Sequence, residues 1–112
     1  MASMSPLTPF PALADRVSFH RTELSVILGL YGRMVAAGLW RDYGISHLRE
    51  AAVFAVFRHT AEHALYRIEK RPKLAARQGQ YAVIGMDGRI LRRGHDLAQV
   101  LRPLEARLIR AV

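Results

Sequence analysis

The 112-residue chain contains no cysteine, which excludes several kinds of site at once. Without thiols it can form no disulfide framework, no thiolate zinc site and no cysteine nucleophile, and a cytoplasmic location is the natural prediction. No apolar run approaches the roughly 20 residues that a membrane helix needs, so we expect no membrane partner. The opening MASMSPLTPFPALAD lacks the basic and apolar blocks of a signal peptide, so we expect a soluble, unprocessed protein.

Acidic residues are also scarce. Nine Asp and Glu accompany 17 Lys and Arg, which gives a formal net charge of +8. Residues 66–93 hold eight of the basic residues against only Glu69 and Asp87, a difference of +6. A local surplus of positive charge favours a polyanion as partner. The alternative interpretation is a charged face that is only solvated.

The composition predicts one domain preceded by a tail. With 51% hydrophobic residues the chain can bury a core, and we expect a single domain over residues 17–112. Residues 1–16 contain Pro6, Pro9 and Pro11, each of which fixes φ and removes a backbone donor. We therefore expect a disordered proline-rich tail there.

A first helix is predicted over Thr22–Ala37. Thr22 belongs to the residue types preferred as N-caps, and Gly38 is placed to end the helix in the left-handed conformation. Inside the helix, Gly29 and Gly32 would allow close packing against a sheet. The apolar positions extend around more than one side, so the helix should be covered on more than one side.

Beyond the first helix, the apolar residues alternate as they do in strands. We expect an antiparallel meander of four to five strands, over Arg41–Ser46, Ala52–Arg58, Leu65–Arg71, Gln80–Met86 and Arg89–Arg93. Asp87-Gly88 is a type I′ turn signal, and a two-residue turn there places Met86 opposite Arg89 and Ile84 opposite Leu91. The same register places Ala82 opposite Arg93.

A second helix is predicted over Asp96–Arg110. Asp96 is placed as its N-cap, and Pro103 must kink or restart it because proline lacks the N–H that a helix interior needs. The predicted fold is therefore α+β, in which a helix, an antiparallel meander and a C-terminal helix combine so that both helices pack on one sheet.

Three blocks of the sequence carry a resemblance to a known family. They are FHRTELSVILGLYGRMVAAGLWRDYGI, LYRIEKRPKLAARQGQYAV and ILRRGHDLAQVL. Together they resemble a family of small alphaproteobacterial proteins that forms a domain of unknown function, the DUF2794-type proteins. The resemblance implies a bacterial cytosolic protein with a single domain, and it supplies no activity, cofactor or catalytic residue.

One pentapeptide formally matches a zinc-protease motif. His59-Thr60-Ala61-Glu62-His63 fits H-x-x-E-H, in which two histidines one helical turn apart bind the metal. That chemistry requires a helix, whereas the flanking AVFAVFR and LYRIEK are typical of strands. We therefore predict a loop without metal, and we find no other catalytic constellation. The prediction is a protein that is not an enzyme and needs no cofactor.

Two functions remain open from the sequence. The first is contact with an RNA or DNA backbone through the basic segment, with Tyr81 available to stack on a base. The predicted contact residues are Arg67, Arg71, Lys73, Arg77, Tyr81 and Arg92. The second is a protein-interaction module or homodimeric adaptor without nucleic acid. It is suggested by the first helix, whose apolar residues extend around more of its surface than one face of a small sheet can cover.

Overall fold

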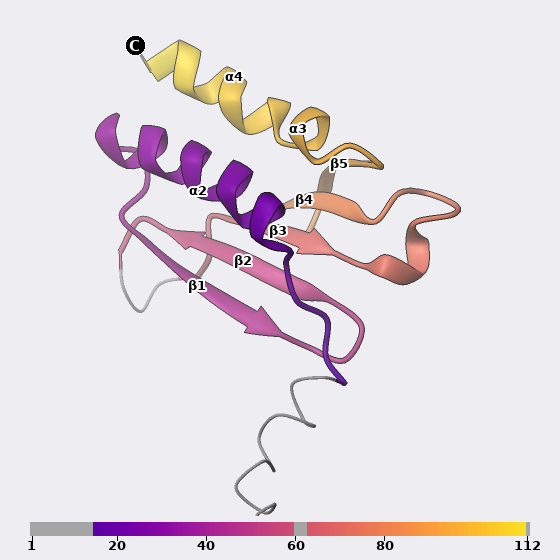
Figure 1. The fold of residues 1–112 in the computed structure, drawn as a ribbon. Helices are drawn as coiled ribbons and strands as arrows, with labels where there is room; N and C mark the ends of the chain where they lie inside the picture. The colour runs from indigo at the N-terminus through magenta and orange to yellow at the C-terminus, as the bar shows by residue number, and fades with distance from the viewer. Residues whose placement is uncertain (1–14, 60–62, 112) are drawn as a thin grey trace, which may run out of the picture.

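We describe residues 15–59 and 63–111 of the chain from a computed structural model. The elements follow in the order α2 (Arg21–Ala36), β1 (Asp42–His47), β2 (Ala52–Phe57), β3 (Tyr66–Lys70), η2 (Pro72–Leu74), β4 (Tyr81–Gly85), β5 (Ile90–Gly94), α3 (Leu97–Val100) and α4 (Arg102–Ala111). The five strands form one antiparallel meander in chain order, and the helices lie together on one side of it (Figure 1). The predicted α+β fold is confirmed.

The core lies between the sheet and the helices. Phe54, Ile68 and Val83 are opposite one another on three neighbouring strands, and all three are fully buried. Burial of each such side chain contributes roughly 1.5–3 kcal/mol, so this row anchors the sheet. The helices complete the core with Ile27, Leu30, Met34, Val100, Leu101 and Leu104.

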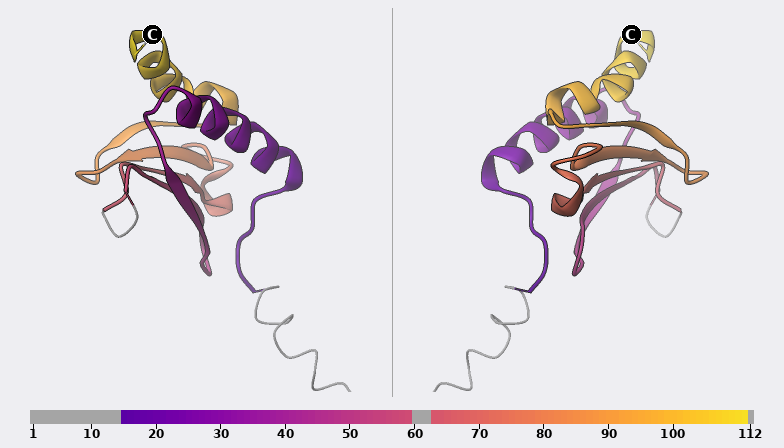
Figure 2. Two further views of the ribbon diagram at one scale, coloured as in Figure 1. Left: turned by 90° about the vertical axis from the view of Figure 1, so that its left-hand side faces the viewer. Right: turned by 90° about the vertical axis from the view of Figure 1, so that its right-hand side faces the viewer.

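The sheet is strongly twisted. In the side views of Figure 2, β1 is turned steeply relative to β4 and β5, while α2 and α4 stay on one side. A right-handed twist between neighbouring strands is the normal result of backbone sterics. Within the described part of the chain, no α-helix covers the other side of the sheet, which we name the open face.

The first helix begins earlier than predicted. Its N-cap is His20, whose Nδ1 accepts a hydrogen bond from the Thr22 N–H at 3.2 Å. In return, Glu23 Oε1 accepts from the His20 N–H at 2.6 Å. Thr22 was the predicted cap because of its residue type, but a reciprocal capping box with Glu23 satisfies two backbone donors at once. Gly38 follows the helix at φ 77°, as predicted.

The two glycines inside α2 do not serve close packing. A Cβ placed on Gly29 or Gly32 would meet no atom within 4 Å, and both residues are exposed. The expectation that they lie against the sheet is therefore wrong, because the helix presents other residues to the core.

Replacing either glycine with alanine should stabilise the protein. Glycine in a helix interior costs roughly 0.5–1 kcal/mol relative to alanine, and no neighbour opposes the added methyl group. We expect Gly29→Ala and Gly32→Ala each to raise the free energy of unfolding by about that amount in a urea titration. A loss of stability in either variant would show that the space beside the helix is needed.

The β4–β5 hairpin departs from the predicted register at its tip. Gly85 N–H donates to the Arg89 carbonyl at 2.8 Å, so three residues rather than two form the loop. Gly88 has a positive φ of 88°, as in a type I turn followed by a glycine bulge. Ile84 consequently pairs with Ile90 instead of Leu91. A register shift beyond this pair restores the expected partnership of Ala82 with Arg93.

The C-terminal region breaks near Pro103, as predicted. Asp96 caps α3 by accepting hydrogen bonds from the Ala98 and Gln99 N–H groups. The chain then restarts as α4 at Arg102, with Pro103 in its first turn, where a missing N–H does no harm.

The predicted tail falls mostly outside the described residues, which begin at Asp15. Arg16, at its expected end, donates from Nη1 to the His47 carbonyl at 3.2 Å. None of the helices in the described ranges is both long enough and apolar enough to cross a membrane.

Candidate nucleic-acid interface

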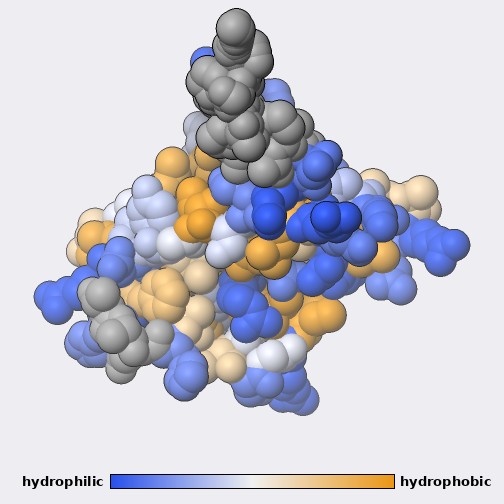
Figure 3. Space-filling view, turned by 90° about the horizontal axis from the view of Figure 1, so that it is seen from below, coloured by the Kyte–Doolittle hydropathy of each residue, from blue (hydrophilic) through white to orange (hydrophobic). Residues whose placement is uncertain are grey.

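The open face of the sheet is defined by strand register. Residues directly opposite one another in antiparallel strands point to the same side, and they alternate with the core residues. One row across the open face is Val53, Glu69, Ala82 and Arg93. The next is Ala55, Arg67, Ile84 and Ile90. Figure 3, viewed from below, shows hydrophilic and apolar residues intermixed.

A carboxylate joins two arginines on this face. Arg71 Nε donates to Glu69 Oε1 at 3.0 Å, and Arg67 Nε lies 3.9 Å from Glu69 Oε2. The Glu69 side chain is only 9% exposed, whereas the arginines are 37% and 39% exposed. The acid is thus enclosed while the guanidinium groups extend into solvent. With Arg93, three positive charges accompany one negative charge.

The connection between β3 and β4 adds two more cations beside Arg71. Lys73 lies in η2, and its Nζ is 3.3 Å from Glu50 Oε2 in an exposed ion pair. Such a pair contributes little and can open to a better partner. Arg77 is exposed and forms no ion pair within residues 15–59 and 63–111. Four predicted contact residues, Arg67, Arg71, Lys73 and Arg77, therefore lie on β3 or in the connection that follows it.

Tyr81 is not available to a base. Its side chain points into the core, the residue is 8% exposed, and its hydroxyl donates to Glu23 Oε2. Burial, followed by the hydrogen bond to the Glu23 carboxylate, raises the pKa of Tyr81 to about 12. The prediction that Tyr81 stacks on a base is therefore wrong, because this ring is part of the contact between the sheet and α2.

Lys70, another member of the basic segment, is also withdrawn from the surface. Its Nζ donates to Glu23 Oε1 at 2.8 Å and to the Ser18 carbonyl at 3.0 Å. A charge neutralised in this way adds nothing to a polyanion surface. The difference of +6 counted for residues 66–93 is therefore larger than the positive charge that this segment exposes to solvent.

Arg92 lies on the opposite side from Arg67. It pairs with the core residue Val83, and its Nη1 donates to the Gln99 carbonyl of α3 at 3.0 Å. The prediction that it belongs to the same surface as Arg67 and Arg71 does not hold. Its neighbour Arg93, which was given no role, is on the open face and donates to the Gly79 carbonyl at 3.4 Å.

Phe57 is an aromatic residue on this face that the sequence analysis did not single out. Phe57 follows the buried Val56 and pairs with Asp42, so it points to the open face and is half-buried. The signal was present in the alternation of AVFAVF, in which every second residue of β2 faces away from the core.

The histidine motif is only partly described. His59 and His63 are exposed and outside any helix, and residues 60–62 lie beyond the described ranges. The residues that the structure describes contain no group of three side chains placed to hold a metal ion.

Comparison with known proteins gives one finding. The model of a family described as protein of unknown function (DUF2794) matches residues 17–101, most of the chain. No curated protein and no solved structure matches it.

Proposed function

The chain belongs to the DUF2794 family of proteins of unknown function, and we propose that it binds the backbone of single-stranded RNA or DNA on its open face. It acts as a binding module without catalysis. The observation that supports this is the arginine pair around the enclosed Glu69, on a sheet face that no described α-helix covers. A sheet presenting cations beside apolar side chains suits a flexible strand, whose phosphates and bases both need partners.

The geometry of the ion pairs leaves donors free for phosphate. A guanidinium group carries five N–H donors, and Glu69 is approached by Nε of each arginine. The terminal nitrogen atoms of Arg67 and Arg71 can therefore donate to phosphate oxygens without breaking these contacts. Glu69 holds both side chains in place, which lowers the conformational entropy lost on binding.

The apolar part of the open face supplies contacts for bases. Phe57 takes the stacking role first assigned to Tyr81, and Ile90 is 54% exposed at the far edge. Stacking on an aromatic ring tolerates every base, so we expect little sequence preference.

Removing three cations, from the open face and from the connection between β3 and β4, should weaken the salt dependence of binding. We expect Arg71→Gln, Arg77→Gln and Arg93→Gln together to lower the slope of log K against log salt by about 2, since each phosphate contact on a single strand contributes about 0.7. Arg67 is retained so that Glu69 keeps a partner. The measurement is fluorescence anisotropy with a labelled oligonucleotide over a range of salt concentrations.

A matched triple variant provides the control. Changing Arg21, Arg102 and Arg110 to Gln removes the same charge from α2 and α4, and all three are exposed. This variant should keep the wild-type slope. An equal decrease of the slope in both triple variants would mean that binding follows net charge alone. No binding of the wild type at low salt would reject the proposal.

A second candidate function is self-association through α2 and β1. Exposed apolar residues gather there, and β1 is an edge strand that pairs only with β2 in the described part of the chain. These residues are Leu28, Val35, Tyr43, Ile45 and Leu48, with exposed fractions of 37–46%. An apolar interface persists at high salt, whereas contact with a polyanion does not. A salt-resistant dimer in sedimentation would favour this alternative.

A further inference from the structure

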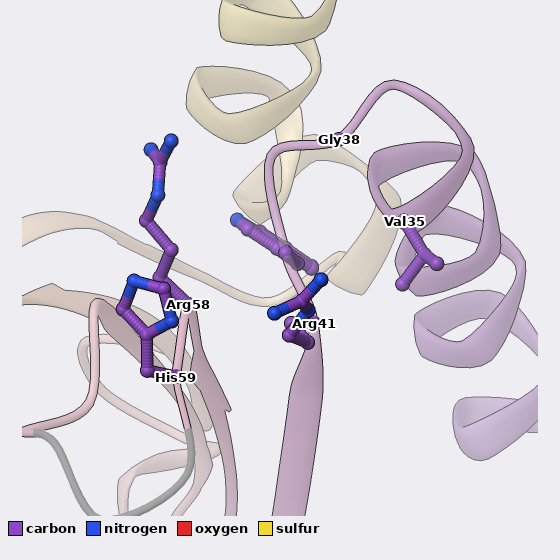
Figure 4. A pocket seen from close by; sticks show the side chains of 6 residues that line it. Val35, Gly38, Arg41, Arg58 and His59 are labelled. Atoms are coloured by element: carbon purple, nitrogen blue, oxygen red, sulfur yellow. The ribbon is translucent and has the colours of Figure 1, made fainter.

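A second group of cations surrounds a hollow away from the open face. The hollow has a volume of about 350 Å³ and lies where the end of α2 meets the start of β1 and the end of β2. It is lined by Val35, Gly38, Trp40, Arg41, Arg58 and His59. In Figure 4, Arg58 and His59 lie on one side of this space, with Arg41 and Val35 across from them.

The two arginines are brought together by strand pairing. Asp42 is opposite Phe57, and the Arg41 N–H donates to the Phe57 carbonyl at 2.8 Å, so Arg41 and Arg58 are neighbours just beyond the paired residues. Two like charges in adjacent antiparallel strands repel each other.

Within residues 15–59 and 63–111, no carboxylate forms an ion pair with either arginine. Neither Arg41 nor Arg58 forms a hydrogen bond through its side chain, or an ion pair, with any residue in the described ranges. This contrasts with Arg67 and Arg71, which share Glu69. His59 adds a third nitrogen-bearing group at the same margin.

The other side of the hollow is apolar. Trp40 is 4% exposed, so its indole is enclosed and only a small part reaches the hollow. Val35 is 40% exposed and extends the wall. Gly38, with φ 77° and no side chain, leaves the rim open. A ligand fitting this arrangement carries a compact anion at one end and an apolar part at the other.

We propose that this hollow binds the phosphate group of a small phosphorylated molecule. The phosphate lies between Arg41 and Arg58, with His59 as a further hydrogen-bonding partner, and the apolar part rests against Val35 and Trp40. A phosphate monoester carries up to two negative charges and several acceptor oxygens, so it matches two guanidinium forks better than a single carboxylate does. This site is separate from the open face, because Arg58 follows the outward-facing Phe57 and lies on the helix side.

The test uses phenyl phosphate as the probe and Trp40 as the reporter. Trp40 is the only tryptophan in the 112 residues and lines the hollow, so its emission reports occupancy directly. We expect a saturable change in emission with phenyl phosphate at millimolar or lower concentration. Benzyl alcohol, which has the ring without the phosphate, should give no saturable change over the same range.

Variants locate the binding. Arg41→Met and Arg58→Met should each weaken phenyl phosphate binding by about tenfold or more, as expected for loss of hydrogen bonds from a charged donor. Arg49→Met is the matched control, because Arg49 is exposed in the turn at the other end of β1 and β2. It should bind as the wild type does.

Loss of binding must be separated from loss of folding. Because Arg41 and Arg58 repel each other, removing either should leave the thermal midpoint unchanged or slightly higher without ligand. Phenyl phosphate should raise the midpoint of the wild type and of Arg49→Met, but not that of Arg58→Met. The proposal is overturned if phenyl phosphate gives no saturable response, or if Arg49→Met weakens binding as much as the other two variants.

Discussion

Replacing Gly79 with alanine is expected to lower the free energy of unfolding by roughly 3 kcal/mol or more. A Cβ at this position would lie 2.3 Å from the Gly94 carbonyl carbon and 2.4 Å from its oxygen, both backbone atoms that cannot swing aside. Its φ of 103° is also a conformation that side-chain-bearing residues rarely adopt. The connection before β4 or the end of β5 must therefore move.

Gly88→Ala separates the cost of the positive φ from the cost of the steric clash with Gly94. Gly88 has a similar positive φ of 88°, but a Cβ there would meet nothing within 4 Å. We expect it to cost only about 1 kcal/mol, from the backbone conformation alone. Urea titrations of the two variants measure the difference, and equal losses would contradict the close approach of Gly79 to Gly94.

The close approach matters for the proposed function. The Gly79 carbonyl accepts the hydrogen bond from Arg93, and the same connection carries Lys73 and Arg77. Moving this backbone displaces cations at one end of the open face. We therefore expect Gly79→Ala to weaken polyanion binding even under conditions in which it remains folded.

Much of the fold could be predicted because it depends on local pattern. Alternating apolar residues placed all five strands within one residue of their observed bounds, and Asp96, Pro103 and Gly38 marked helix ends correctly. The tip of the β4–β5 hairpin differed because Asp87-Gly88 suits two loop lengths. Asp87 Oδ1 accepts from the Arg89 N–H at 3.0 Å within the longer loop.

The composition of the site was harder to predict, because it depends on register between strands. The sequence does not say whether Arg67 and Arg92 share a face, since a shift of one residue moves a side chain to the other side of a sheet. The observed pairing places Arg67 opposite Ile84 and Arg92 opposite Val83, on different faces. The sequence also could not pair Tyr81 with Glu23, which is 58 positions away.

That long-range partnership forms a polar cluster between α2 and the sheet. Glu23 Oε1 accepts from Lys70 and from the His20 N–H, while Oε2 accepts from the Tyr81 hydroxyl. The side chains of Glu23 and Lys70 are only 12% and 16% exposed. Because one carboxylate satisfies donors from three segments, it ties the start of α2 to β3 and β4.

Replacing Glu23 with glutamine is expected to lower the free energy of unfolding by about 2–4 kcal/mol at neutral pH. The substitution keeps the size of the side chain but leaves the Lys70 ammonium group enclosed without its counter-charge. Glu105→Gln provides the control, because the ion pair of Glu105 with Arg33 is 44% and 54% exposed and should contribute less than about 1 kcal/mol. Similar losses in both variants, measured in urea, would contradict the role assigned to the cluster.

The cluster also predicts how stability depends on pH. Burial alone would raise the pKa of Glu23, but hydrogen bonds from Lys70, Tyr81 and His20 lower it below its ordinary 4.5. The contribution of the ionised Glu23 carboxylate to folding stability is therefore present above pH 4.5 and is lost as the pH falls through the lowered folded-state pKa.

The pKa of Tyr81 shifts the other way, from 10 to about 12. The contribution of its neutral hydroxyl to folding stability is therefore full below pH 10 and is lost as the pH rises from 10 towards about 12. Tyr81→Phe should remove the alkaline loss of stability due to this hydroxyl and should reduce the acid loss only in part, because Lys70 and the His20 N–H still lower the pKa of Glu23. Glu23→Gln should reduce both losses. Urea titrations at a series of pH values test this. An alkaline profile unchanged in Tyr81→Phe would show that the hydroxyl does not hold α2 on the sheet.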